Sequence, residues 1–315
     1  MKVIKSSVDV LEQQPGIEGM KRHIELIGRL SHKSEDKITN TSYEKFIDIM
    51  KNMGHYAVFD MGTVYLKIPL TRMDIFFKLI NTIPFTKFCF HKLSIYITTT
   101  YRIIVQKDLE HIMEKYWCEP TIHHYHRVTS HWICSRYTSH QIVRHASIRP
   151  IQESMRYCNY SSEKFGSGIT YILPQWVYRV RNKIGTTIDP LTSEKRDWIL
   201  KLDGEELWKT LCSYDRTVAS RNKIWKECED EYLWELSTDE SEKLKPEEAR
   251  GSLPHDTKTE LYLCGYLKDW YKKPKTKERT GFFYLRSDSS AQEDVRVLSR
   301  ELEFLFRQYA YNKLK

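Results

Sequence analysis

The chain has 315 residues, of which 40% are hydrophobic and 29% are charged, with only 12 glycines and 10 prolines. This composition is typical of a globular protein with a sizeable core, and it excludes collagen-like and intrinsically disordered chains. The net charge of +8 at pH 7 favours an anionic partner such as a nucleotide, an anionic cofactor or nucleic acid.

Predicted helices and strands alternate in the N-terminal half. Residues 41–44 (TSYE) have the pattern of a capping box, which predicts a helix that runs to about Asn52. Residues 64–68 and 93–97 are rich in β-branched and aromatic side chains and are predicted strands. Between them, residues 73–80 predict a short helix.

Long amphipathic helices dominate the C-terminal half. After a predicted strand at 169–173, apolar residues recur at helical spacing over 205–233, which predicts one long helix or two. Pro246 is placed to begin the helix that contains Arg250. The clearest helix is the last one, and its apolar stripe consists of Val295, Leu298, Leu302, Leu305, Phe306 and Tyr309.

Two charged segments without periodicity, 237–245 and 271–280, are predicted surface loops and not linkers between domains. The sequence contains no internal repeat and no low-complexity tract. We therefore predict a single domain that spans residues 1–315 and has an α+β fold.

Several features favour a soluble protein of the cytoplasm. The opening segment, MKVIKSSVDVLEQQ, lacks the apolar core of a secretory signal. The most apolar stretch, 76–97, is interrupted by lysines and a histidine, whereas a membrane-spanning helix needs about 20 mostly apolar residues. The seven cysteines are odd in number and form no Cys-x-x-Cys pair, which predicts reduced thiols.

The segment 141–157, QIVRHASIRPIQESMRY, concentrates side chains that suit an anionic ligand. These side chains are, in chain order, Gln141, Arg144, His145, Arg149, Gln152, Glu153, Ser154 and Arg156. A guanidinium group binds phosphate through two parallel hydrogen bonds, and a glutamine amide both donates to and accepts from the edge of a base. Taken by themselves, these residues fit a surface basic cluster held by salt bridges equally well.

The spacing within this segment resembles the signature of flavin-dependent thymidylate synthases. In that family Arg-His-Arg is followed, further along the chain, by a serine that usually lies within Gln-Glu-Ser-x-Arg-Tyr. Residues 152–157 match this second half in full, and the lead-in 141–145 is also similar to the family's. One position departs from the pattern, because Ala146 stands where the family has arginine.

Further blocks resemble the longer members of the family and occur in the family's order. These blocks are 29–34, 54–60, 96–102, 126–129, 157–160, 169–174, 246–250, 253–254, 285–286 and 291–292. Within the second block, the family has Ser or Thr at the position of Ala57 and Glu at the position of Asp60. The resemblance therefore covers most of the chain.

The resemblance implies a twisted, mainly antiparallel sheet flanked by long helices, with a family-type insert at about 66–126. It also implies a homotetramer whose active sites lie between subunits. The implied reaction is the FAD-dependent reductive methylation of dUMP to dTMP, in which methylenetetrahydrofolate supplies the carbon and NADPH re-reduces the flavin.

The resemblance further implies which residues do this work. Arg286 is the implied catalytic residue, because it would stabilise the negative charge that develops on the uracil ring. The residues implied to bind dUMP are Gln141, Arg144, Gln152, Glu153, Ser154, Arg156, Arg250 and Arg286. The residues implied to contact FAD are His55, Arg144, His145, Arg149 and Lys268.

The flavin half of this predicted site departs most from the family. Arg149 belongs to the set as a candidate to replace the charge that is missing at Ala146. Lys268 stands where the family has arginine, and Ser290 stands where some members have histidine. An altered activity is therefore expected to originate in this half.

Two other functions stay open on the sequence alone. The same scaffold fits an enzyme that modifies C5 of UMP or dCMP, by methylation or hydroxymethylation. The positive charge also fits a non-catalytic binder of nucleotides or nucleic acid, although nucleic acid is the weaker prediction.

Two chemical roles are not expected. Ser154 is expected to bind substrate and not to act as a nucleophile, because nothing orients His145 as its base. No metal site is expected at His123, His124 and His126, because no cysteine or carboxylate accompanies them at a recognised spacing.

Overall fold

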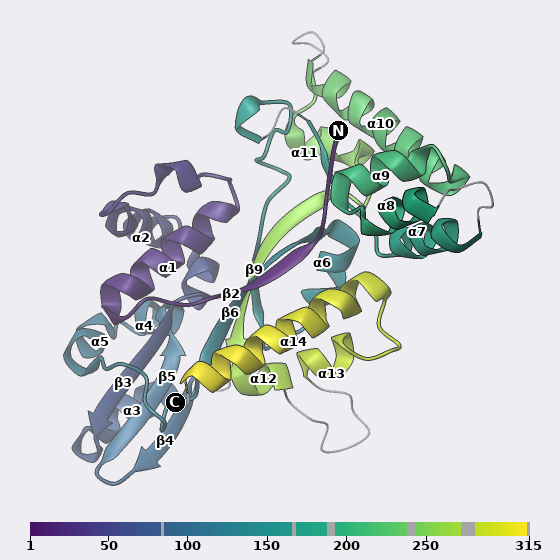
Figure 1. The fold of residues 1–315 in the computed structure, drawn as a ribbon. Coiled ribbons are helices and arrows are strands. Elements are labelled where there is room, and N and C mark those ends of the chain that lie inside the picture. Colours follow the sequence, from purple (N-terminus) through teal and green to yellow (C-terminus); the bar gives the residue numbers. More distant parts are fainter. Residues whose placement is uncertain (83–84, 166–167, 188–192, 238–242, 272–280, 314–315) are drawn as a thin grey trace.

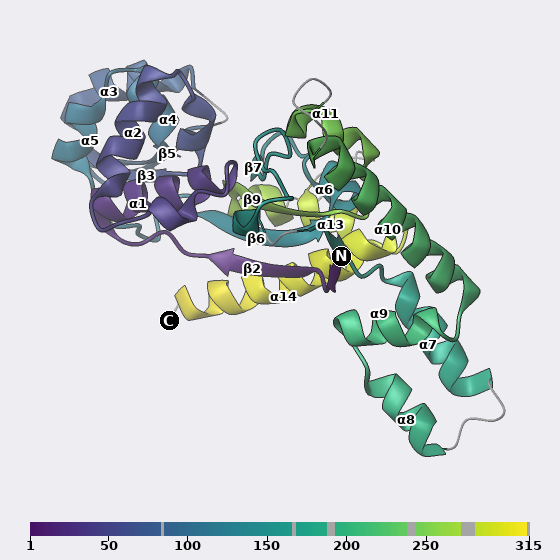
Figure 2. The ribbon, with the colours of Figure 1, turned by 90° about the horizontal axis from the view of Figure 1, so that it is seen from above.

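The computed structural model describes residues 1–82, 85–165, 168–187, 193–237, 243–271 and 281–313. These residues form three parts, which we call the N-terminal lobe, the central sheet and the helical lobe (Figure 1). The two lobes lie at opposite ends of the central sheet, as the view from above shows (Figure 2).

The central sheet consists of four antiparallel strands in the order β2-β6-β9-β7. These strands are β2 (Ser7–Leu11), β6 (Arg127–Ser135), β9 (Lys258–Tyr266) and β7 (Arg149–Gln152). Side chains alternate between the two faces of a strand, so Val128, Trp132 and Cys134 of β6 lie in one buried apolar cluster. The helices of this part are α6 (Arg136–Ile142), α12 (Leu267–Tyr271), α13 (Phe282–Arg286) and α14 (Glu293–Lys313).

Helix α14 covers this apolar face, while the opposite face meets the N-terminal lobe. The buried residues of α14 that join the cluster, spaced three or four apart, are Val295, Leu298, Leu302 and Phe306. The predicted C-terminal helix is therefore confirmed. On the other face, Ile27 of helix α1 (Gly16–Leu30) packs with Tyr262 and Cys264 of β9.

The N-terminal lobe packs helices around an antiparallel sheet of order β3-β5-β4. Besides α1, its elements are α2 (Ser42–Asn52), β3 (Thr63–Pro69), α3 (Met73–Ile80), β4 (Lys87–His91), β5 (Ser94–Thr100), α4 (Tyr101–Gln106) and α5 (Glu110–Tyr116). The predicted helix at 73–80 and the predicted strands at 64–68 and 93–97 are confirmed. The insert expected at about 66–126 falls largely within this lobe.

The predicted capping box at 41–44 is wrong, although helix α2 ends at Asn52 as expected. Thr41 has φ −126° and ψ −1°, outside the extended region typical of an N-cap residue, and its side chain accepts no capping hydrogen bond. The side chain of Ser42 instead forms hydrogen bonds with residues that lie earlier in the chain. Its Oγ accepts from the Thr39 N–H at 2.8 Å and donates to Glu25 at 2.9 Å.

The helical lobe packs its helices on a parallel pair of short strands, β1 (Lys2–Ile4) and β8 (Thr170–Ile172). The helices are α7 (Trp176–Thr187), α8 (Ser193–Lys201), α9 (Gly204–Cys212), α10 (Arg216–Ser237) and α11 (Pro246–Ala249). The predicted helical region 205–233 is two helices, because Asp215 Oδ1 accepts from the N–H groups of Thr217 and Val218 and so begins a new one. Stacked rings of Trp208, Trp225 and Tyr171 join α9, α10 and β8.

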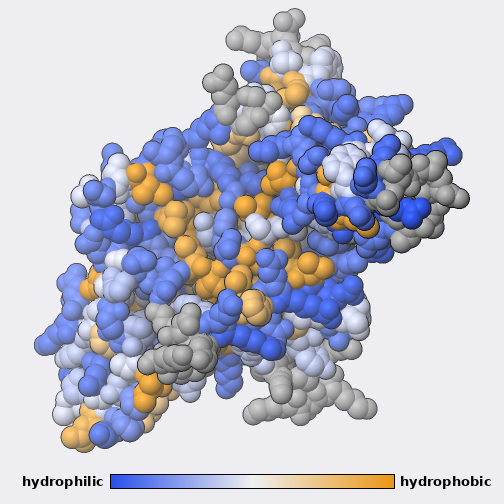
Figure 3. All heavy atoms as spheres, viewed as in Figure 1, coloured by the Kyte–Doolittle hydropathy of each residue, from blue (hydrophilic) through white to orange (hydrophobic). Residues whose placement is uncertain are grey.

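The element content confirms an α+β fold with mainly antiparallel pairing. No helix within the described ranges is long and apolar enough to cross a membrane. Apolar side chains nevertheless gather near the middle of the face seen in Figure 1, between the lobes (Figure 3). The charged segments at 237–245 and 271–280 lie largely outside the described residues, and the single-domain organisation stays a prediction.

Candidate active site

The predicted motif folds into a pocket at one edge of the central sheet, which we call the motif pocket. Its cavity measures about 270 Å³, close to the lower end of the range of about 300–1,000 Å³ that is usual for ligand pockets. The residues that line it are Arg136, His140, Gln152, Glu153, Ser154, Met155, Arg250 and Thr259. The fold thus brings together four of the predicted dUMP-binding residues from strand β7, the loop after it and the turn after α11.

Two arginines give the motif pocket its charge. Burial, and then the nearby charge of Arg250, lowers the pKa of Arg136. Arg250 Nε donates to the Glu247 carbonyl oxygen at 3.0 Å. Among the described residues, neither guanidinium forms an ion pair with a carboxylate. Two such cations beside one cavity favour the binding of a phosphate dianion.

Glu153 lines the motif pocket, but its carboxylate forms hydrogen bonds with side chains of the protein interior. Its side chain is buried, and it accepts hydrogen bonds from Lys258 Nζ at 3.0 Å and from the Tyr160 hydroxyl at 2.8 Å. Lys258 Nζ also donates to Glu260 at 2.8 Å. The negative charge of Glu153 is therefore balanced from behind, which leaves the positive charge of the arginines dominant in the cavity.

A second cluster contains Arg286, Arg144 and His145, from α13 and from the loop after α6. Arg286 Nε donates to His145 Nε2 at 3.1 Å, so the proton of the neutral imidazole lies on Nδ1. Burial, and then the charge of Arg286, lowers the pKa of His145 to about 4. His145 is thus neutral at pH 7 and holds Arg286 as a hydrogen-bond acceptor, and no described contact joins it to Ser154.

The other predicted substrate residues lie at the edges of these two clusters. Arg156 is exposed and pairs with Glu247 at 3.3 Å, which links the motif to α11. Gln141 is half-buried in the last turn of α6, and Arg144 is exposed just beyond it.

A search against protein-family models matches residues 104–310 to the family described as "Thymidylate synthase complementing protein". The chain belongs to this family. The resemblance seen in the sequence is therefore confirmed. A search of curated proteins gives no match.

Solved structures of a "UMP/dUMP methylase PolB" from Streptomyces cacaoi, bound with 5-Br UMP and 5-Br dUMP, are similar over 98% of this chain. The two matches cover 92% and 93% of the PolB chain. Their sequence identities are 11% and 10%, and their TM-scores are 0.38 and 0.39. At TM-scores this low, the likeness carries no argument about this chain.

The residues predicted to contact the flavin do not surround one cavity in the described part of the chain. His55, Arg144 and Lys268 are exposed. Arg149 lies elsewhere: its guanidinium is 4.5 Å from the ring centre of Phe85, and Nε is 3.9 Å from Asp60 Oδ2.

The cavity beside Arg149 is too small for any part of a flavin. It measures about 20 Å³, room for a single water molecule. Arg149 Nε is buried and forms no hydrogen bond with a described residue, while 33% of the side chain as a whole is exposed. Of the predicted set, His55, Arg144 and Lys268 are thus exposed, whereas Arg149 is only partly exposed.

Sequence reasoning missed Arg136, His140, Met155 and Thr259 as pocket residues. Arg136 and His140 are four residues apart on α6 and therefore share one face of the helix, but this short helix has no clear apolar period in the sequence. Thr259 reaches the pocket because β9 pairs with β7, a contact between segments about a hundred residues apart. The four-residue spacing of Arg136 and His140 is the one sequence signal that could have placed these two residues on one helix face.

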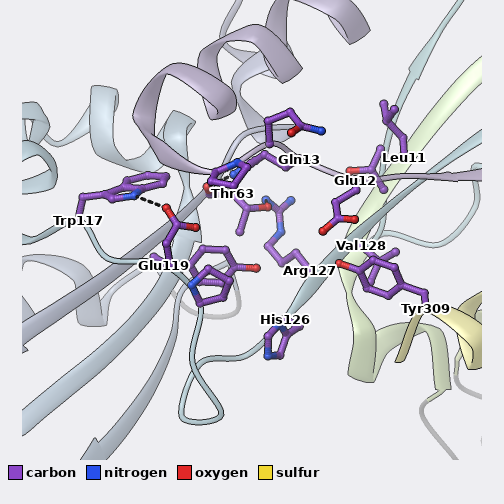
Figure 4. A pocket seen from close by; sticks show the side chains of 15 residues that line it. Leu11, Glu12, Gln13, Thr63, Trp117, Glu119, His126, Arg127, Val128 and Tyr309 are labelled. Atoms are coloured by element: carbon purple, nitrogen blue, oxygen red, sulfur yellow. Dashed lines mark hydrogen bonds between the residues drawn. The ribbon is translucent and has the colours of Figure 1, made fainter. Parts of the chain in front are cut away.

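A second cavity lies between the central sheet and the N-terminal lobe and surrounds Arg127 (Figure 4). It measures about 100 Å³, which is small for a nucleotide. Arg127 is buried and donates to the Asp60 carbonyl oxygen at 2.7 Å and to Thr63 Oγ1 at 3.2 Å. The guanidinium thereby ties β6 to the N-terminal lobe.

His123 and His124, two members of the histidine cluster, form contacts within the N-terminal lobe. His124 is buried, and its ring nitrogens contact the Leu66 carbonyl oxygen and Thr121 at 3.1 Å. His123 stacks on His91 with ring centres 4.0 Å apart. Within the described ranges, no group of three or more His, Cys, Asp or Glu side chains is arranged to hold a metal ion.

Proposed function

We propose that the chain is a flavin-dependent thymidylate synthase that methylates dUMP to dTMP. The observation that carries the proposal is the motif pocket, where Arg136 and Arg250 face one cavity without a carboxylate partner among the described residues. A nucleoside monophosphate supplies the dianion that this pair requires. Family membership supports the pyrimidine base and the reaction.

In this proposal the substrate spans the two clusters. Arg136 and Arg250 bind the phosphate, with Ser154 and Arg156 at the rim, while Gln141, Gln152 and Arg144 contact the nucleoside. Glu153 shapes the wall from behind. Arg286 lies against the uracil and stabilises negative charge on the ring, and the neutral His145 orients Arg286 through the 3.1 Å hydrogen bond.

FAD would supply the hydride in this reaction, methylenetetrahydrofolate the carbon, and NADPH the electrons that re-reduce the flavin. The residues proposed to contact FAD are His55, Arg144, His145, Lys268 and, with the least support from its surroundings, Arg149. We also propose a homotetramer with active sites between subunits, and the exposure of three members of this set on one chain supports it. We further propose a single-domain enzyme of the cytoplasm.

The test is a product analysis on a nucleotide panel. The purified protein is incubated with FAD, methylenetetrahydrofolate and NADPH, together with dUMP, UMP or dCMP, and the products are identified by mass. Methylation of dUMP alone supports the proposal. Modification of UMP or dCMP, or addition of a hydroxymethyl group, would instead establish the same scaffold with another acceptor.

Absence of any product would favour the non-catalytic alternative, and a filter-binding assay at two salt concentrations then examines nucleic acid. Binding dominated by phosphate contacts falls steeply as salt rises. A protein that makes no product and retains a nucleic acid in this salt-dependent way contradicts the proposed function.

A further inference from the structure

The amide of Gln152 is held at the back of the motif pocket by two hydroxyl groups. Gln152 is the last residue of β7, and its side chain is half-buried. Its Nε2 lies 3.1 Å from Ser139 Oγ and 3.0 Å from Thr259 Oγ1. Both hydroxyl residues are buried, one on α6 and one on β9, so the amide is fixed by two different elements.

The proton of Ser139 decides which way the amide faces. Ser139 Oγ lies 2.8 Å from the Arg136 carbonyl oxygen, and a carbonyl has no proton to give. This contact therefore takes the only proton of the Ser139 hydroxyl. Toward Gln152 that oxygen is an acceptor, so the amide must present its NH2 group to it. The orientation follows from the hydrogen-bond network and not from the shape of the side chain.

The Gln152 amide then has only its oxygen, a hydrogen-bond acceptor, left for a ligand. An NH2 group has two protons, and the contacts with Ser139 and Thr259 take both. Gln152 Oε1 accepts no hydrogen bond from any described residue, and Gln152 lines the cavity. Arg136, Arg250 and His140, by contrast, all bring N–H donors to the same cavity.

We infer that Ser139 and Thr259 are positioning residues that turn Gln152 into an obligatory hydrogen-bond acceptor, which selects a nucleotide with a donor at that point. This inference rests on the proposed function. In a uridine nucleotide the donor is either the imide N3–H of the base or a hydroxyl of the sugar. A glutamine whose amide is not held by these two hydrogen bonds can turn over. It would then pair equally well with a donor or an acceptor of the ligand and would give no such selection.

Equilibrium binding of three nucleotides to the full-length protein tests the inference. The ligands are dUMP, 3-methyl-dUMP, which lacks the imide proton, and 2′,3′-dideoxyuridine monophosphate, which lacks the sugar hydroxyl. The proteins are the wild type, Thr259→Val, which removes one of the two acceptors for Nε2, and Thr259→Ser, which keeps it.

The inference predicts that Thr259→Val binds dUMP about three- to tenfold more weakly, as expected when one neutral hydrogen bond is lost. For one of the two analogues the same substitution should leave the dissociation constant unchanged, and that analogue identifies the donor. Thr259→Ser should retain the wild-type affinity for dUMP. If Thr259→Val is not folded, as judged by thermal melting, Ser139→Ala, which removes the other acceptor for Nε2, should give the same pattern.

Two results overturn the inference while the proposed function stands. One is an equal loss of affinity for all three nucleotides in Thr259→Val, which indicates a general structural defect. The other is no change for any of them. A wild-type protein that does not bind dUMP at all contradicts the proposed function itself, and this inference with it.

Discussion

The two arginines of the motif pocket are held to different degrees. Arg250 is anchored through Nε to the Glu247 carbonyl oxygen, whereas the guanidinium of Arg136 forms no hydrogen bond with a described residue. Burial, and then repulsion from the charge of Arg250, lowers the pKa of Arg136. A dianionic ligand relieves this repulsion, so both side chains should contribute to affinity in proportion to the charge of the ligand.

Replacing either arginine should therefore weaken binding of the monophosphate only. Arg250→Gln and Arg136→Gln are each expected to cost about 1.5–3 kcal/mol, or about ten- to a hundredfold in the dissociation constant of dUMP. Titration calorimetry measures this, with Arg307→Gln, an exposed arginine near the end of α14, as the matched control. Equal losses for dUMP and for deoxyuridine, which has no phosphate, would contradict the assignment.

The contact between Arg286 and His145 makes a prediction about protonation. The charge of Arg286 contributes to lowering the pKa of His145 to about 4, so Arg286→Gln should raise that pKa, while burial still holds it below the ordinary value. A histidine-resolved NMR titration measures the change. The same variant should lose about a hundredfold or more in dUMP methylation, the usual cost of one preorganised donor. A pKa that does not move would show that the contact is not made in solution.

At the scale of elements, the α1–β6 contact depends on an uncharged histidine. His23 of α1 is buried and lies 3.2 Å from Thr129 Oγ1 of β6. Burial, and then the charge of Arg127, lowers the pKa of His23 to about 3. Below its ordinary pKa of about 6.5, the unfolded chain binds a proton that the folded protein excludes. The stability contributed by the neutral form is complete above pH 6.5 and is lost as the pH falls toward 3.

His23→Gln should reduce the loss of stability in mild acid, because glutamine keeps a hydrogen-bonding group but does not titrate. Between pH 7 and pH 5, wild type is expected to lose about 2 kcal/mol more of its unfolding free energy than the variant. Urea unfolding at both values measures the difference. Identical pH dependence in the two proteins would mean that His23 is protonated without opening the contact.

Helix α14 is expected to stabilise the central sheet through one stripe of its surface. Leu302 is fully buried within the apolar cluster, whereas Phe304, two residues on, is 60% exposed. Leu302→Ala should cost about 2–5 kcal/mol of unfolding free energy, as is usual for a buried leucine. Phe304→Ala is the matched control and should change it by less than about 0.5 kcal/mol. A similar cost at both positions would contradict the packing described.

The elements that carry strong periodicity were predictable, and those that build the site were not. The stripe of α14 and the helix at 73–80 follow from local spacing alone. Strands β6, β7 and β9 went unpredicted, because their pairing joins residues far apart in the chain, as Gln152 joins Leu261. The motif therefore named Gln152 and Ser154, and the separate block 246–250 named Arg250, while Arg136 and Thr259 emerged only from the folded sheet.

At the scale of the whole molecule, the two halves of the proposed site differ in completeness. The nucleotide half is a cavity formed within one chain. The flavin half consists of three exposed residues, of the half-buried His145, and of Arg149, which lies beside a cavity of about 20 Å³. Apolar side chains such as Val297 and Phe304 of α14 are also exposed. A second chain that covers such surfaces and completes the flavin half is what the predicted homotetramer provides.

The visible absorption spectrum of the purified protein, recorded with added FAD and then with dUMP, tests the central claim most directly. We predict a bound flavin spectrum that survives gel filtration and shifts when dUMP binds beside it, because the claim places both ligands in one active site. The shift should be lost in Arg250→Gln at dUMP concentrations that saturate the wild type. A colourless protein that retains no added FAD, with or without dUMP, would contradict the account.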